Sequence, residues 1–139
     1  MAQKVRELMS ADPVTVASHV PLVEAAQKMR DEDIGDVLVL DGDRLCGVVT
    51  DRDLVVRGLA EGREPTTTPV GEICTHEVVT VSPDDDAGRA VELMREHAVR
   101  RLPVTQDGAP VGIISIGDLA MELDEQSALA DISAAPPNN

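Results

Sequence analysis

Two stretches of this chain, Gly47-Val48-Val49-Thr50-Asp51-Arg52-Asp53 and Gly112-Ile113-Ile114-Ser115-Ile116-Gly117-Asp118, follow one pattern. Each begins with glycine and two apolar residues, continues with a hydroxyl residue and ends on an aspartate three positions later. The same offset of 65 residues, without a gap, relates the whole segment from Val5 to Leu54 to a second copy that ends at Leu119. A constant offset over so long a segment predicts an internal repeat, and the repeat decides the architecture.

Each copy has the same order of expected elements. The apolar residues Leu22, Ala25 and Met29, like their counterparts 65 residues later, recur at the spacing of one helix face. Two apolar stretches joined by an Asp-Gly turn follow each helix and predict a β-hairpin. The expected elements are a turn or short helix (5–9; 70–74), a strand (14–16; 78–81), a helix (21–31; 85–97), two strands (37–40 and 45–50; 102–105 and 110–115) and a last helix (51–62; 117–124). We therefore expect the α/β class, as two tandem pseudo-symmetric β-α-β-β-α repeats packed as one module.

Composition marks the boundaries between the expected parts. Repeat 1 is expected at 3–60, a linker rich in proline and threonine at 61–69, and repeat 2 at 70–124. The remainder, 125–139, is polar and rich in alanine and proline, and we expect it to be a flexible tail.

Charge and composition exclude several function classes. The formal net charge of −14 opposes binding to a phosphate backbone, and the absence of Phe, Tyr and Trp removes the platforms on which bases stack. No apolar stretch is long enough for a membrane span, and the first residues lack the apolar core of a signal peptide. With two cysteines, too few for a disulfide framework, we expect a cytoplasmic protein that binds neither nucleic acid nor membrane.

The element order, with the glycine-to-aspartate pattern closing each copy, resembles the CBS domain pair, also called the Bateman module. The resemblance covers roughly residues 3 to 124 and is greatest to small stand-alone bacterial CBS-domain proteins, including stress-response members in actinobacteria. It implies two clefts between the repeats, each combining the Thr/Ser-x-x-Asp end of one repeat with adenine contacts from the other. It also implies a regulatory ligand, either AMP, ADP, ATP or S-adenosylmethionine, and no required cofactor.

The resemblance assigns residues to both clefts. The cleft expected to be the main site, here named the Asp53 cleft, combines Thr50, Arg52, Asp53, Cys74, Glu77, Val79, Val99, Arg100 and Arg101. The other, named the Asp118 cleft, combines Met9, Asp12, Val14, Ile34, Gly35, Asp36, Ser115, Gly117 and Asp118.

The residue types suit a nucleotide. A carboxylate can accept both hydrogen bonds of a ribose diol, and a hydroxyl at a helix N-terminus can hold phosphate oxygens. Arginine binds phosphate in a two-pronged geometry, and three arginines fall in the Asp53 cleft. We therefore expect the Asp53 cleft to be the main nucleotide site, and the Asp118 cleft to be weak, empty or occupied by an uncharged nucleoside-like ligand.

Each assignment has a structural alternative. Asp53 and Asp118, with Thr50 and Ser115, could serve as helix caps. Arg100 and Arg101 could form ion pairs with the acidic residues between 31 and 36. The cysteines and histidines lack a zinc-binding spacing, so we expect no metal, with Cys74 and His76 at packing or solvent positions and Cys46 as a small buried apolar residue.

The sequence contains no glycine-rich phosphate loop, zinc-protease or nucleophile-elbow motif, so we expect no enzyme. The favoured function is a non-catalytic sensor that binds an adenosine-containing nucleotide and signals to an unknown protein partner, as a homodimer joined by a Val/Leu/Met helix face. The alternative is a structural or stress-response interaction module whose clefts are unoccupied. An enzyme that no motif reveals is a third and weaker alternative, and it would turn over an added nucleotide.

Overall fold

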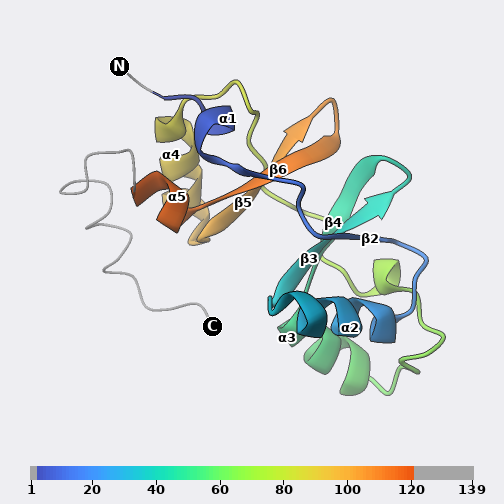
Figure 1. The fold of residues 1–139 in the computed structure, drawn as a ribbon. Helices are drawn as coiled ribbons and strands as arrows, with labels where there is room; N and C mark the ends of the chain where they lie inside the picture. The colour runs from blue at the N-terminus through green and yellow to red at the C-terminus, as the bar shows by residue number, and fades with distance from the viewer. Residues whose placement is uncertain (1–2, 121–139) are drawn as a thin grey trace. The chain divides into compact units, whose positions relative to one another are not determined.

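The computed structural model describes residues 3–120, and it contains two small α/β units (Figure 1). The elements in chain order are α1 (Val5–Leu8), β1 (Ser10–Ala11), β2 (Thr15–Ala17), α2 (Leu22–Glu32), β3 (Asp36–Asp41), β4 (Arg44–Thr50), α3 (Asp51–Asp53), η1 (Leu54–Leu59), η2 (Val70–Glu72), α4 (Ala87–His97), β5 (Arg101–Gln106), β6 (Ala109–Ser115) and α5 (Ile116–Ala120). None of the helices within residues 3–120 is long and apolar enough to cross a membrane. The end of the last expected helix, 121–124, and the expected tail, 125–139, lie outside the described residues.

The two spatial units divide the chain differently from the two sequence repeats. Unit 1 consists of Met1–Asp12 and Val79–Asn139, and unit 2 of Pro13–Val78. The leading segment of each repeat therefore belongs to the unit that holds the body of the other repeat. Backbone hydrogen bonds show this exchange in unit 1, where Val5 N donates to Asp85 O at 2.9 Å.

Unit 2 is built on the sheet β2-β3-β4. Strands β2 and β3 are parallel, whereas β3 and β4 form the expected antiparallel hairpin, with Gly42 at a positive φ in its turn. Residues 37 to 39 are all buried, so both faces of β3 are covered. The apolar face of α2 (Leu22, Ala25 and Met29) joins a core that also contains Ile73 and Cys74.

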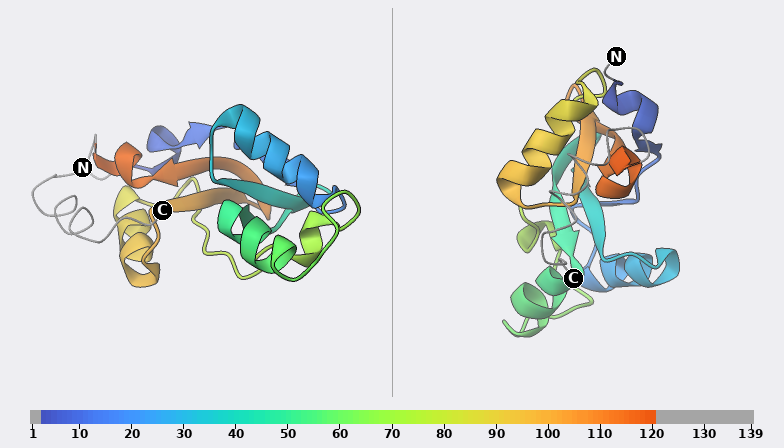
Figure 2. Two further views of the ribbon diagram at one scale, coloured as in Figure 1. Left: turned by 90° about the horizontal axis from the view of Figure 1, so that it is seen from below. Right: turned by 90° about the vertical axis from the view of Figure 1, so that its left-hand side faces the viewer.

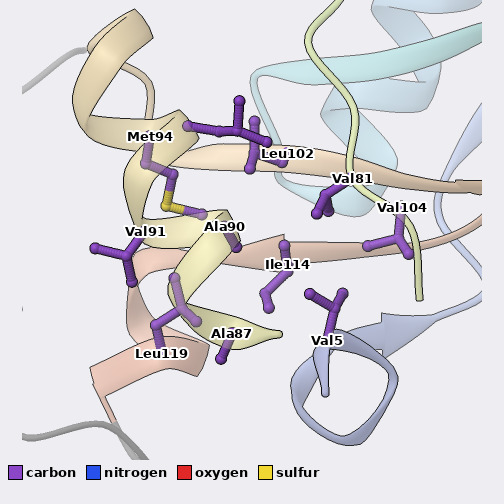
Figure 3. Packing of buried hydrophobic residues seen from close by; sticks show 11 residues of the cluster. Val5, Val81, Ala87, Ala90, Val91, Met94, Leu102, Val104, Ile114 and Leu119 are labelled. Atoms are coloured by element: carbon purple, nitrogen blue, oxygen red, sulfur yellow. The ribbon is translucent and has the colours of Figure 1, made fainter. Parts of the chain in front are cut away.

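Unit 1 is built on the sheet β1-β6-β5, and α4 packs against β5 (Figure 2). Its core consists of aliphatic side chains and Met94, which come together from α1, α4 and both long strands (Figure 3). The expected strand 78–81 is wrong: within it only Val81 forms a bridge, a parallel one to Val104. Strand β1, which the sequence did not reveal, instead adds to the edge of this sheet at β6.

The segment after β4 also differs from its expected form. A single α-helix over 51–62 was expected, but α3 is three residues long and continues as the π-helix η1. Gly58 is buried in η1, and a Cβ atom there would lie 3.0 Å from Leu22 Cδ1. This close contact between η1 and α2 leaves Val55, Val56 and Leu59 on the outer side, with exposed fractions of 55%, 42% and 64%.

Candidate functional site

The Thr50–Asp53 turn stands at the junction of β4 and α3. Thr50 N donates to Asp53 Oδ2 at 3.0 Å, and Asp53 N donates to Thr50 Oγ1 at 3.0 Å. This reciprocal pair is a capping box, so the interpretation of both residues as helix caps is confirmed. Asp53 Oδ1 lies 4.0 Å from Arg57 Nη1, and the Asp53 side chain is 15% exposed.

The Ser115–Asp118 turn repeats this arrangement at the junction of β6 and α5. Ser115 N donates to Asp118 Oδ2 at 2.8 Å, and Asp118 N donates to Ser115 Oγ at 3.2 Å. In addition the Ser115 hydroxyl donates to Asp118 Oδ2 at 3.0 Å. The aspartate of each repeat thus fixes the backbone where a strand becomes a helix.

The start of each hairpin lies against the capping turn of the same unit. Asp51 N donates to Gly35 O at 2.9 Å, and Ile116 N donates to Arg100 O at 2.9 Å. Correspondingly, Asp36 pairs with Thr50 in one sheet and Arg101 pairs with Ser115 in the other. In each unit the structure therefore places residues of one predicted cleft beside residues of the other.

The remaining predicted residues are divided between the units. Unit 2 carries Val14, Ile34, Gly35, Asp36, Thr50, Arg52, Asp53, Cys74 and Glu77, and unit 1 carries Met9, Asp12, Val79, Val99, Arg100, Arg101, Ser115, Gly117 and Asp118. Each predicted cleft takes members from both lists and stays a prediction. Asp36, Arg100 and Arg101 each already take part in an interaction.

A second group of side chains comes together within unit 2. The Sγ atoms of Cys46 and Cys74 and a ring nitrogen of His76 all lie within 4.8 Å of one another. The Nδ1 atom of His76 is 3.7 Å from Cys46 Sγ and 3.9 Å from Cys74 Sγ. Both thiols are free of disulfide bonds, and we name this group the Cys46–Cys74–His76 cluster.

Backbone pairing creates the cluster. Val48 N donates to Thr75 O at 3.0 Å, and Thr75 N donates to Val48 O at 2.9 Å, which joins β4 to the segment after η2. Gly47 directly follows Cys46 in β4. A Cβ atom at Gly47 would stand 2.4 Å from Thr75 O and 2.8 Å from Cys74 Sγ. Glycine at this position is therefore what allows the two segments to approach so closely.

Burial differs strongly within the cluster. Cys74 is 1% exposed, Cys46 is partly buried and His76 is exposed. Burial and the neighbouring Cys46 raise the pKa of the Cys74 thiol to about 11. Cys74 is accordingly a neutral thiol at physiological pH.

The sequence spacing did not predict this cluster, because Cys46 lies about half a repeat before Cys74 and His76 in the chain. Cys46 was expected to be a buried apolar residue, yet it is only partly buried and its Sγ faces an imidazole. The one usable signal was the 65-residue offset, which places Cys46 opposite Val111 and Cys74 opposite Met9. Both cysteines therefore stand where the other repeat has an apolar residue.

Comparison with known proteins agrees with the fold. The CBS domain model matches residues 5–58 and 70–125. Hypoxic response protein 1 of Mycobacterium tuberculosis is 38% identical over 130 residues, which cover 93% of this chain and 91% of the relative. The CBS domain-containing protein YhcV of Bacillus subtilis is 35% identical over 125 residues, 89% of either chain.

Solved structures give the same result. A crystal structure of Hypoxic Response Protein I with two coordinated zinc ions matches with a TM-score of 0.80 and 38% identity, over 87% of this chain and 99% of the other. The CBS domain pair of protein MJ0100, solved in complex with 5′-methylthioadenosine and S-adenosyl-L-methionine, shares the fold with a TM-score of 0.72 at 24% identity, over 87% and 95% of the two chains. The repeat, the two α/β units and these relatives lead to one conclusion: the chain belongs to the CBS-domain family and is a CBS domain pair, a regulatory module.

Proposed function

We propose that this chain is a non-catalytic sensor that binds an adenosine-containing ligand, of the class of AMP, ADP, ATP or S-adenosylmethionine. The observation that carries the proposal is the duplicated Thr/Ser-x-x-Asp turn. In the first copy Asp53 Oδ2 accepts the capping bond from Thr50 N, while Oδ1 lies 4.0 Å from Arg57 Nη1. A carboxylate has about four lone-pair positions, so the capping bond leaves acceptor capacity for a ribose diol.

The relatives support a regulatory role. The CBS domain pair of MJ0100 was solved in complex with 5′-methylthioadenosine and S-adenosyl-L-methionine. The relative from Mycobacterium tuberculosis is named for the response to hypoxia. We extend to this chain a ligand of the same chemical class and a role in stress response, in the cytoplasm, with an unknown protein as the receiver of the signal.

We further propose a homodimer. Val55, Val56 and Leu59 form an exposed apolar face on η1, more than half exposed at Val55 and Leu59. Adjacent apolar side chains exposed on one helix are typical of a surface that another protein covers. Sedimentation of the full chain should show a dimer, and Leu59→Glu should shift it to the monomer; a monomeric wild type would contradict this part of the proposal.

One observation favours the alternative, an interaction module without a nucleotide. Both capping turns are internally satisfied, and Asp36, Arg100 and Arg101 already have interactions. Phosphate binding at the arginines would compete with any of these interactions that involve the guanidinium groups. The alternative therefore predicts no ligand effect on stability.

Thermal unfolding with and without AMP, ATP and S-adenosylmethionine separates the two functions. A ligand at about 100 times its dissociation constant adds roughly 2.7 kcal/mol to the free energy of unfolding. The matched variant is Asp53→Asn, because an asparagine oxygen still accepts from Thr50 N but the charge and one acceptor are lost. We expect a ligand-dependent rise in Tm that Asp53→Asn removes; no rise with any of the ligands would favour the interaction module.

A further inference from the structure

We propose that the Cys46–Cys74–His76 cluster is a metal site that binds one zinc-like divalent cation through two thiolates and an imidazole, with the fourth position open. The site lies within unit 2 and does not depend on the proposed nucleotide ligand. It gives Cys74 a role other than the adenine contact that the family resemblance assigned to it.

The distances between donors fit a tetrahedral ion. With Zn–S near 2.3 Å and Zn–N near 2.0 Å, a tetrahedron requires about 3.6 Å between sulfur and nitrogen and about 3.8 Å between two sulfurs. His76 Nδ1 already stands 3.7 Å from Cys46 Sγ and 3.9 Å from Cys74 Sγ. Changes of a few tenths of an ångström would therefore bring both sulfur-to-nitrogen distances to the required values.

The imidazole has a partner that orients it. His76 Nε2 lies 3.2 Å from Gly71 O, where an Nε2–H group can donate. In that tautomer Nδ1 has no proton and can bind a cation, with Cys46 Sγ 3.7 Å and Cys74 Sγ 3.9 Å away. A histidine ligand that donates its other ring N–H to a carbonyl is the usual arrangement around zinc.

A second carbonyl competes for the ring proton. His76 Nδ1 is 3.2 Å from Cys46 O, so the metal-free ring can also donate there. In this tautomer Nε2 is the unprotonated nitrogen, 3.7 Å from Cys74 Sγ. A cation that binds both thiolates selects the first tautomer, because only Nδ1 lies close to both sulfurs.

The backbone holds the donors in place before any ion binds. The two hydrogen bonds between Val48 and Thr75 fix the cysteine-bearing segments side by side, and Cys74 is anchored in the apolar core of unit 2. His76 is exposed, so one of the three donors is in contact with solvent. Little conformational entropy is lost on binding, because the ligands come from segments that the fold already aligns.

The donor types restrict the ion. Thiolate and imidazole ligands favour zinc and other soft or borderline ions over magnesium and calcium, which prefer oxygen. Three protein ligands with an open fourth position are typical of exchangeable or ligand-accepting zinc sites, whereas structural sites are closed by four. We accordingly expect water, or a small anionic ligand, at the fourth position.

A cobalt titration of the full chain tests the proposal. The reduced, metal-free protein is titrated with Co²⁺, which is expected to produce the intense visible bands of a tetrahedral ion and a thiolate-to-cobalt band in the near ultraviolet. The bands should saturate at one cobalt per chain and disappear when Zn²⁺ is added. Cys46→Ser and His76→Ala should each weaken cobalt binding by roughly 100-fold or more, an effect at least as large as the loss of a supporting residue.

His97→Ala is the matched control, since His97 is an exposed histidine of α4 in the other unit, and it should bind cobalt like the wild type. His76 is exposed, so His76→Ala is expected to fold, which circular dichroism verifies. Two outcomes overturn the proposal: a wild type with both thiols reduced that gives no thiolate-to-cobalt band, or a band that persists unchanged in both Cys46→Ser and His76→Ala. A Cys46–Cys74 disulfide that forms in air and returns to a cobalt-binding dithiol on reduction supports it, because the same two sulfurs are then shown to meet.

Discussion

In each unit a glycine of the second hairpin strand packs against the leading segment of the other repeat, and we name this contact the glycine junction. The two junctions share their backbone arrangement but differ in their side chains. In unit 2, Gly47 of β4 lies against Cys74 and Thr75; in unit 1, Gly112 of β6 lies against Met9 and Ser10, where a Cβ atom would stand 2.7 Å from Met9 Sδ. The positions equivalent to Cys46, Cys74 and His76 hold Val111, Met9 and Ala11. Pseudo-symmetry thus fixes the pairing of segments, whereas the side chains decide that only one junction carries metal-binding donors.

The largest expected effect follows from adding a methyl group at the junctions. Gly47→Ala places a Cβ atom 2.4 Å from Thr75 O, a backbone atom that cannot rotate away, so we expect a loss of about 3 kcal/mol in the free energy of unfolding. Gly112→Ala meets Ser10 O at 2.7 Å, and we expect a loss of about 2 kcal/mol.

Urea unfolding measures both losses, and cobalt binding separates the junctions. Gly47→Ala should also abolish the cobalt bands, while Gly112→Ala should leave them intact. Equal loss of cobalt binding in both variants would show that general destabilisation, rather than the local geometry of unit 2, controls the metal.

Metal loading should have an effect between those of the two glycine variants. Free zinc at about 100 times its dissociation constant is expected to raise the free energy of unfolding by roughly 2.7 kcal/mol, because the ion binds the folded junction. Differential scanning calorimetry with zinc and with a chelator measures this rise. His76→Ala should unfold at the same temperature in both conditions; an equal zinc effect in that variant would place the ion elsewhere.

Breaking a capping turn should lower the free energy of unfolding by a smaller amount. Thr50→Ala and Ser115→Ala each remove a side-chain acceptor for a helix N–H, at 3.0 and 3.2 Å, and we expect losses of about 1 kcal/mol. Thr50→Ser keeps the acceptor and serves as the control. An undiminished stability of both alanine variants in urea unfolding would contradict the capping role that the two repeats share.

The smallest expected effect on the free energy of unfolding comes from the Cys74 thiol and occurs only at alkaline pH. Burial and Cys46 raise the pKa of Cys74 from 9.0 to about 11 in the folded protein, so the protonated thiol stabilises the fold. That contribution is complete below pH 9 and is lost as the pH rises through about 11. Cys46 and His76 face this thiol, and Arg57 lowers its pKa slightly.

The free energy of unfolding of the metal-free protein, measured from pH 8 to pH 11, checks this prediction. Relative to Cys74→Ala, the wild type should lose stability above pH 9, the ordinary pKa of a thiol. Parallel curves for the two proteins would show that burial does not raise the pKa of this thiol.

Local pattern was sufficient to predict most of the fold. The helical spacing of Leu22, Ala25 and Met29 placed α2 within one residue, and the Asp-Gly turns placed both hairpins. The π-helix η1 was missed, because the contact of Gly58 with Leu22 that accompanies it is tertiary. Strand β1 was missed for a similar reason, since its partner β6 lies about a hundred residues away in the chain.

The candidate sites, like the fold, were predictable only where the interacting residues are close together in the chain. The Thr50–Asp53 and Ser115–Asp118 turns were predictable because donor and acceptor are three residues apart and helix capping has a local signature. The Cys46–Cys74–His76 cluster depends on the bridge between Val48 and Thr75, and no spacing rule reports such a pairing. Sequence motifs for zinc detect closely spaced ligands, not ligands that a fold brings together from two distant segments.

Isothermal titration calorimetry on the wild type, Asp53→Asn and Asp118→Asn tests most directly the claim that this CBS domain pair is a sensor in which the first repeat carries the main ligand contact. With AMP, ATP and S-adenosylmethionine as titrants, we predict that at least one ligand binds the wild type. Asp53→Asn should weaken its affinity by about tenfold or more, since a hydrogen bond to a charged group contributes roughly 1.5–3 kcal/mol. Asp118→Asn should change the affinity by less than about threefold. Binding abolished by Asp118→Asn and unchanged by Asp53→Asn, or no heat of binding with any of the three, would contradict it.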